Sequence, residues 1–160
     1  MDPALIHHYF GSKEKLFAAT LEFPVHAPDR LLAALSGPRE GLGERLTRAY
    51  LELWEDPATH GGMVIAVRAS LSSDEAMARV RPTIVDMLSR APASDVPGPD
   101  AQTRFALAMA HLVGVAAVRH ISKVPPLRDL GFEELIARTA PAVQLHLTEG
   151  CEPGERRRTS

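Results

Sequence analysis

Apolar residues recur at intervals of three and four positions along most of this chain, which is the spacing of one face of an α-helix. The pattern predicts helices over residues 29–35, 43–54, 60–71, 74–88, 101–121 and 132–147. Two shorter helices are expected before Pro24, one ending at Gly11 and one beginning at Ser12. No stretch of useful length alternates as a strand does. The sequence therefore predicts an all-α fold with seven or eight helices.

Proline and glycine mark the expected breaks between these helices. Residues 36–38, 91–99 and 124–126 are predicted to be turns or loops. Pro82 and Pro141 lie inside two of the helical segments. Because proline removes a helix hydrogen bond, we expect a kink, an interruption or a restart at both positions.

The segment 101–121 is apolar on every side in its middle, so we expect it to be covered on every side. Its mainly apolar part, residues 105–118, contains His111 and is shorter than the roughly 20 residues that span a bilayer. It is therefore predicted to be a buried helix. The small residues Ala110, Gly114 and Ala117 would allow another helix to approach closely.

Composition and charge narrow the possible functions. The formal net charge is −2, so any contact with DNA must come from a small local surface or from residues outside this chain. The single cysteine, Cys151, excludes a disulfide within the chain and suits a reducing cytoplasm. No signal peptide is recognisable at the N-terminus. We expect a cytoplasmic protein.

Chemistry-bearing motifs are scarce. The histidines lack the spacing to cysteines or carboxylates that metal sites show, and no glycine-rich phosphate loop is present. Cys151 has no evident base partner. We therefore expect no catalytic residues, no metal and no cofactor, and we do not expect an enzyme. His60, His111 and His120 could serve as polar anchors near a cavity, although a satisfied core histidine is the more ordinary interpretation of His111.

The N-terminal segment 2–17 reads DPALIHHYFGSKEKLF. It resembles the end of the TetR-family DNA-binding domain, where a short recognition helix is followed by an aromatic pair, a turn and the next helix. The matching residues are Ile6, His7, Tyr9, Phe10, Gly11, Ser12, Lys13, Glu14 and Leu16. The family usually has Tyr at the position of His7. Two further helices precede the recognition helix in the family, so we expect that Met1 marks a shortened or mis-assigned start.

The resemblance implies a DNA-contacting surface in this segment. Recognition helices present their N-terminal residues to the major groove, and free N–H groups at a helix start attract phosphate. The DNA-binding residues predicted on this basis are Pro3, Ala4, Leu5, His7, His8, Tyr9 and Lys13. The partner would be double-stranded DNA with a palindromic operator.

The resemblance also implies a domain division and two further sites. Residues 1–22 would be a remnant of the DNA-binding domain, 23–148 a helical ligand-binding and dimerisation domain, and 149–160 a disordered tail. The expected pocket residues are Trp54, Met63, Val67, Met77, Phe105 and Met109, although core packing is the ordinary role of each. The last two long helices would form a homodimer through Leu107, Gly114, Val118, Ile136 and Val143, with a purely intramolecular core as the alternative.

These features together predict a ligand-responsive, DNA-binding transcriptional regulator that acts as a repressor and answers to an unknown small-molecule effector. The alternative from another class is a helical ligand-binding or dimerisation module that does not bind DNA itself. A small helical enzyme is the weakest of the three hypotheses.

Overall fold

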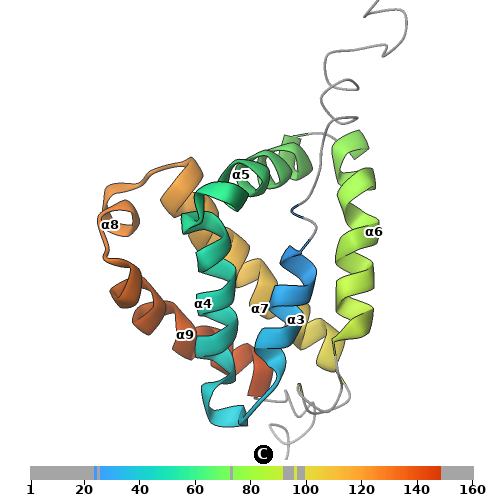
Figure 1. The fold of residues 1–160 in the computed structure, drawn as a ribbon, viewed down its shortest axis with the longest axis vertical. Helices are drawn as coiled ribbons and strands as arrows, with labels where there is room; N and C mark the ends of the chain where they lie inside the picture. Colours follow the sequence, from blue (N-terminus) through green and yellow to red (C-terminus); the bar gives the residue numbers. More distant parts are fainter. Residues whose placement is uncertain (1–23, 25, 73, 92–95, 97–99, 149–160) are drawn as a thin grey trace, which may run out of the picture.

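The computed structural model describes residues 24, 26–72, 74–91, 96 and 100–148. Within these ranges the chain is helical, with no strand (Figure 1). The elements are α3 (Ala27–Leu35), the 3-10 turn η1 (Arg39–Gly41), α4 (Leu42–Glu55), α5 (Pro57–Ser72), α6 (Asp74–Arg90), α7 (Ala101–Ala116), the π-helical η2 (Ala117–Ile121), α8 (Pro125–Arg128) and α9 (Phe132–Thr148). The predicted all-α class is confirmed. The two helices expected before Pro24 and the expected tail 149–160 lie outside the described residues.

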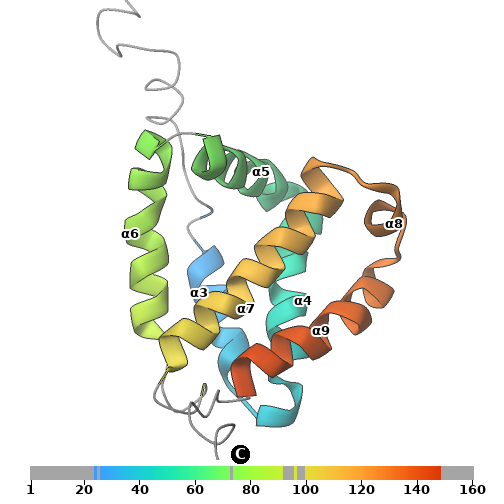
Figure 2. The ribbon, with the colours of Figure 1, turned by 180° about the vertical axis from the view of Figure 1, so that it is seen from behind.

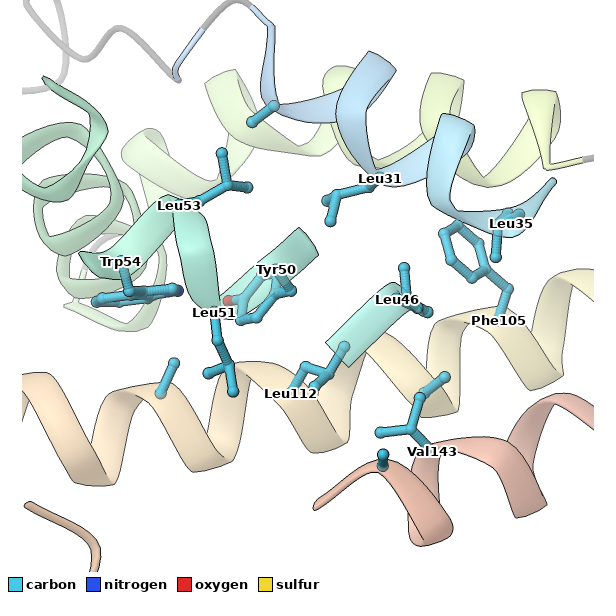
Figure 3. Close-up of a cluster of buried hydrophobic side chains, with 14 of the residues drawn as sticks. Leu31, Leu35, Leu46, Tyr50, Leu51, Leu53, Trp54, Phe105, Leu112 and Val143 are labelled. Carbon is cyan, nitrogen blue, oxygen red and sulfur yellow. The ribbon is translucent and has the colours of Figure 1, made fainter. Parts of the chain in front are cut away.

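Helix α4 lies at the centre of this arrangement and contacts α3, α5, α7 and α9. Its sequence buries one broad face, from Leu46 and Tyr50 to Leu53 and Trp54, as the helical spacing predicts. Helix α7 crosses α4, behind it in Figure 1 and in front of it in Figure 2, and α9 packs against both. Side chains from α3, α4, α7 and α9 meet in one core (Figure 3).

The contact between α4 and α9, which we call the α4–α9 seam, depends on Gly43. A Cβ at this position would lie 2.5 Å from the backbone nitrogen of Gln144 and 2.6 Å from the carbonyl oxygen of Ala140. Only glycine lets the two backbones approach this closely. The backbone N–H of Gly43 donates to Oε1 of Gln144 at 2.6 Å, and Nε2 of Gln144 donates to the carbonyl of Arg39 at 2.7 Å. The side-chain amide of Gln144 therefore pairs with backbone groups at the start of α4, whereas the buried hydroxyl of Thr47, one turn further along α4, has no hydrogen-bond partner within the described residues.

A salt bridge joins α4 to α9 at the other end of the seam. The guanidinium of Arg48 on α4 donates to both carboxylate oxygens of Glu133 on α9, at 2.7 and 2.8 Å. This hydrogen bonding holds the pKa of Glu133 below its usual value. The pair is exposed, so it fixes the geometry of the seam more than it stabilises the fold.

Arg104 in the first turn of α7 ties that helix to the C-terminal end of α9. Its side chain is buried, and its guanidinium donates to the carbonyl oxygens of His146 and Leu147. The last carbonyls of a helix have no partner within the helix, and a cation is favourable beside them. Arg104 therefore caps α9 from outside.

The prolines behave differently from the sequence-based expectation. Helix α6 continues through Pro82 and α9 continues through Pro141, so the predicted interruption or restart at these positions is wrong. Both prolines and the residues four positions earlier, Ala78 and Ala137, are exposed, so water can satisfy the freed carbonyls. Pro125, expected only to end a helix, instead begins α8, because proline suits a first helical turn.

The helix formed by α7 and η2 runs from Ala101 to Ile121, and its 21 residues are long and apolar enough to cross a membrane by length and composition. The core helix of a soluble protein passes the same test, so the expectation that this segment is too short to span a bilayer is not overturned. The apolar window extends beyond residues 105–118 because few charged residues interrupt the helix ends. In the structure this helix packs against α4, α6 and α9.

Candidate effector site and dimer surface

The structure gathers most of the predicted pocket residues in one place. Trp54, Met63, Val67 and Phe105 are buried in the main core, and the half-buried Met109 packs against it. Met77 is half-buried on α6 and does not join this cluster. None of the six predicted residues lines either of the cavities described below.

Two polar atoms are buried within this core. The hydroxyl of Tyr50 and Nε1 of Trp54 point toward each other (Figure 3). Among the residues that the structure describes, neither atom has a hydrogen-bond partner of good geometry, and the two residues are 2% and 1% exposed. Burial raises the pKa of Tyr50, while the nearby Trp54 acts in the opposite direction. Buried polar groups are normally paired, so this pair offers a donor and an acceptor to a ligand.

The other face of Trp54 meets two histidines. The ring of His120 stacks on the indole with centroids 5.2 Å apart and planes inclined by 18°. The ring of His60 meets Trp54 edge-on at 6.5 Å and His120 at 5.8 Å. Nδ1 of His60 donates to the carbonyl oxygen of Trp54 at 2.6 Å, which places a proton on that nitrogen and caps the end of α4. Of the three histidines expected near a cavity, His60 and His120 line the cavity described below, and their role as polar anchors stays a prediction.

Nε2 of His120 is buried and has no hydrogen-bond partner within the described residues. The nearest carboxylate oxygen, Oε1 of Glu55, lies 3.7 Å away, beyond hydrogen-bond distance. Burial lowers the pKa of His120, and the charges of Arg119 and His60 act in the same direction, against Glu55. His120 is therefore a neutral imidazole near neutral pH.

Arg119, next to His120 in the chain, connects several segments through its guanidinium. Its guanidinium pairs with Oε1 of Glu55 at 3.2 Å and donates to the carbonyls of Leu127 and Leu130 at 2.7 and 2.9 Å. One side chain thus joins the end of α4 to both ends of the α8 turn. Its side chain is only 11% exposed, so this contact is held away from bulk water.

A cavity of about 510 Å³ opens beside this cluster, and we call it the basic cavity. It is lined by Glu55, His60, Val64, Arg68, Arg119, His120, Lys123 and Arg128. Three of these, at positions 60, 64 and 68, lie on one face of α5 because four-residue steps repeat each helical turn. The end of the α7–η2 helix lies between α5 and α8, where the remaining residues come together (Figures 1 and 2).

The backbone at the cavity is unusual in two ways. Residues Ala117–Ile121 form a π-helix, a rare conformation found often at functional sites. Lys123, two residues further on, has φ of 52° in the left-handed region. This conformation ends the helix, because it lets the N–H of Val124 donate to the carbonyl oxygen of Val118 at 3.2 Å.

A second cavity, of about 320 Å³, lies along the α4–α9 seam. Its lining includes Glu40, Glu44 and Glu133 together with the single cation Arg48. The cation already pairs with Glu133 and Glu44. This cavity therefore offers no free positive charge to a ligand.

Some of the residues predicted for the dimer surface are exposed and others are buried. Leu107 is 50% exposed, Gly114 is exposed and Val118 is half-buried, all along one side of the α7–η2 helix. Ile136 and Val143 are 1% and 0% exposed in the single chain, so their assignment to an interface is wrong. Their side chains face the core of their own chain, because the apolar stripe of α9 packs against α4 and α7.

The α7–η2 helix has one exposed side in the single chain, at Leu107, Ala110 and Gly114. The expectation that this helix is covered on every side therefore requires cover from beyond its own chain on that side, and it stays a prediction. On the adjacent helix α9, Pro141 and Leu145 are exposed as well, with Leu145 at 50%. The two helices therefore present a joint surface of apolar and small residues.

The predicted DNA-contacting residues, Pro3, Ala4, Leu5, His7, His8, Tyr9 and Lys13, lie outside the described residues. Within the described ranges, no group of three or more His, Cys, Asp or Glu side chains could hold a metal ion. Sequence reasoning missed Tyr50 as a polar group and missed the cations of the basic cavity. The spacing of positions 60, 64 and 68 was a signal for one wall of the cavity, but nothing local linked that wall to Arg119 or Arg128.

Comparisons with known proteins identify the family of this chain. Residues 40–147, well over half of the chain, match the family model of the tetracyclin repressor-like C-terminal domain. No curated protein matches the chain. Among solved structures, a TetR-family regulator from Streptomyces coelicolor A3 is 31% identical, with a TM-score of 0.62, covering 93% of this chain and 78% of that one. The chain therefore belongs to the TetR family of transcriptional regulators.

Proposed function

We propose that this protein is a cytoplasmic, homodimeric DNA-binding regulator that acts as a repressor and releases its operator when a small molecule binds. The observation that carries the proposal is the family match across residues 40–147, which include every helix from α4 to α9. The resemblance of residues 2–17 to the end of a TetR-type reading head supports the DNA-binding part. Regulators of this family are generally not enzymes.

The joint surface of α7 and α9 supports the homodimer. An exposed apolar surface on a helix pair is stabilised by a second copy related by a two-fold axis, since the same patch then covers itself. Leu107 and Leu145 supply apolar area, and Ala110 and Gly114 allow close approach of the partner helix. The proposed interface therefore keeps Leu107, Gly114 and Val118 and replaces the two buried residues with exposed residues of α9.

The effector site proposed here is the region around Trp54. Its buried phenol and indole groups, Tyr50 and Trp54, lack good hydrogen-bond partners in the described part of the chain. The adaptable side chains of Met63 and Met109 lie in the same core. A ligand that separates these side chains would displace α4 and α5 relative to α7. In a dimer with two DNA-binding domains, such a shift changes the spacing of these domains. It therefore weakens simultaneous contact with both half-sites of the operator.

The dimer is tested by Leu107→Glu and Leu145→Glu, with Leu71→Glu as the matched control. Leu71 is 74% exposed on α5, away from the proposed interface. Sedimentation velocity is expected to show monomers for the first two variants and dimers for the control, with operator affinity lost in parallel. Dimers that persist in both interface variants would exclude this surface.

A gentler pair of variants separates the interface from folding. Gly61 and Gly114 are both helical glycines around which an added Cβ would meet no atom within 4 Å. Alanine should stabilise the monomer by about 0.5–1 kcal/mol at either position. Only Gly114→Ala is expected to weaken dimerisation, because its methyl group enters the space of the partner helix.

DNA binding is measured on palindromic sites near the protein's own gene, at a stated salt concentration because phosphate contacts are salt-dependent. Specific binding to a two-fold site by the dimer supports the regulator. A folded dimer that binds none of these sites would instead favour a ligand-binding module without DNA binding of its own.

A further inference from the structure

We infer that the basic cavity is a binding site for a small-molecule anion carrying a carboxylate or phosphate group. Arg68 and Lys123 would supply the attracting charge, and Nε2 of His120 would donate a hydrogen bond to the anion. This site lies beyond the apolar core around Trp54 and is separated from it by the stacked indole and imidazole rings.

The charge balance of the cavity favours an anion. Four cations line it, Arg68, Arg119, Lys123 and Arg128, against the single carboxylate of Glu55. Arg119 is paired with Glu55, and Arg128 is paired with Asp129 at 2.6 Å. The side chains of Arg68 and Lys123 make no hydrogen bond or ion pair with any part of the chain that the structure describes. Two uncompensated cations therefore line one cavity, and their summed charge attracts an anion.

The polar atom at the inner wall points to the same ligand. The side chain of His120 is 11% exposed, and its Nε2 is fully shielded yet has no hydrogen-bond partner within the described ranges. A buried polar atom without a partner costs about 1–3 kcal/mol. An anion that brings an oxygen to this nitrogen relieves that cost, and His120 takes up a proton from solvent to donate to it.

The backbone brings the cations of this wall together. The π-helical turn, a conformation often found at functional sites, carries Arg119 and His120. The left-handed conformation of Lys123 ends the helix, with the N–H of Val124 donating to the carbonyl oxygen of Val118, and leaves Lys123 lining the same cavity.

The volume indicates a molecule larger than a bare ion. Pockets for small ligands span about 300–1,000 Å³, and the cavity holds about 510 Å³. Val64, between His60 and Arg68 on α5, gives the remainder of the ligand an apolar contact. A concave site of this size suits a small molecule better than the backbone of a DNA duplex, which binds to open surfaces.

A ligand here would bridge α5 to the α7–η2 helix, so it could act as the effector or as part of one. That regulatory consequence rests on the proposed function, whereas anion binding itself does not. The two are separable because binding is measured without DNA.

Trp54 is the only tryptophan and stacks on His120, so its fluorescence reports on the inner wall of the cavity. The full chain is titrated with sodium pyrophosphate and, separately, with sodium benzoate, at ionic strength held constant with sodium chloride. A saturable change that chloride alone does not produce is expected for at least one probe. Pyrophosphate alone would identify a phosphate site, and benzoate alone would identify a carboxylate site.

The variants Arg68→Gln and Lys123→Gln are each expected to weaken binding about tenfold, the loss of one hydrogen bond to a charged group. Arg79→Gln, which removes an exposed arginine of α6 outside the cavity, should change the affinity less than about twofold. His120→Phe keeps the stacked ring and removes the nitrogen, so it should weaken binding while the melting temperature stays unchanged or rises.

The proposal is overturned if neither probe produces a saturable change, or if Arg79→Gln weakens binding as much as the cavity variants, which would indicate adventitious attraction. It is also overturned if only duplex DNA changes the fluorescence and Arg68→Gln abolishes that change. A protein that binds pyrophosphate or benzoate in the cavity but never binds an operator would uphold the site and refute the regulator. A repressor that is released only by a neutral ligand and binds no anion would uphold the regulator and refute the anion site.

Discussion

The α4–α9 seam and the basic cavity use similar residues in opposite ways. At the seam, Gly43 and Gln144 satisfy one another, and Arg48 is matched to Glu133. At the cavity, Arg68 and Lys123 face the solvent-filled space without a partner in the described chain, and Nε2 of His120 is shielded but unpaired. Both regions join helices that are distant in sequence, but the charged groups and the side-chain amide of the seam are paired, whereas two cations of the cavity are not.

The difference separates residues that hold the fold from residues that can bind a ligand. The seam should lose stability when one of its closely packed members, Gly43 or Gln144, changes, because the change leaves a clash or an unsatisfied group. An incomplete site should tolerate substitution, and even gain stability, while it loses binding. The predictions below test this contrast, beginning with the largest effect.

Gly43→Ala should destabilise the protein by about 3 kcal/mol, because the added Cβ would collide with backbone atoms of α9 that cannot move independently. Chemical denaturation measures the loss. Gly61→Ala is the control, since it adds the same atom to a helix where nothing lies within 4 Å. If both substitutions had the same effect, the close approach at the seam would not be the reason for glycine at position 43.

Arg104→Met should cost about 2 kcal/mol, because the carbonyls of His146 and Leu147 would lose a charged donor while remaining partly buried. Methionine keeps the apolar stem of the side chain. Arg79→Met on the exposed surface of α6 should change the free energy of unfolding by less than about 0.5 kcal/mol. Hydrogen exchange is expected to show faster opening in the last turn of α9 in the Arg104 variant only.

Lys123→Gly should stabilise the protein by about 0.5–1 kcal/mol, since glycine adopts φ of 52° without the cost borne by lysine. Lys123→Ala removes the same charge but keeps the strained conformation, so its stability should not rise. Both variants should lose affinity for the anion probes. Destabilisation by Lys123→Gly would show that the ammonium contributes to folding. Lys123 would then stabilise the fold, as the residues of the seam do.

His120 gives the smallest expected effect, on the pH dependence of stability. Its pKa in the folded protein is lowered by burial, so the unfolded chain binds more protons just below the ordinary histidine pKa of about 6.5. Stability should therefore decline as the pH falls below about 6.5. His120→Phe should flatten that decline, measured by denaturation midpoints between about pH 8 and pH 5. Anion binding in the native protein should instead strengthen over this range, as His120 gains a proton.

Periodicity was sufficient to locate the helices. Positions 46, 50, 53 and 54 were predicted to share a face of α4, and the structure buries all four. Proline was the misleading signal, since Pro82 and Pro141 interrupt neither helix. A local rule cannot tell that the freed carbonyls lie at the solvent-exposed side of a helix, because that depends on which side the core occupies.

The candidate sites were only partly predictable. Trp54, Met63, Val67, Phe105 and Met109 share one core as expected, whereas Met77 stands apart from it. Ile136 and Val143 have the apolar character of interface residues, but they are used within the chain. An apolar stripe on a helix indicates that something covers it and does not indicate whether that cover is its own chain or a second copy.

By itself, the sequence determined that this protein is helical, where its long helices lie and, through residues 2–17 and their spacing, which family it belongs to. These properties follow from local spacing, since helix formation and motif geometry depend on residues close together in the chain. Tertiary structure alone decided the requirement for glycine at position 43 and the capping of α9 by Arg104. It also decided the gathering of Arg68, Arg119, Lys123 and Arg128 around one cavity. Each of these depends on the approach of helices distant in sequence, which no periodicity within a single helix can specify.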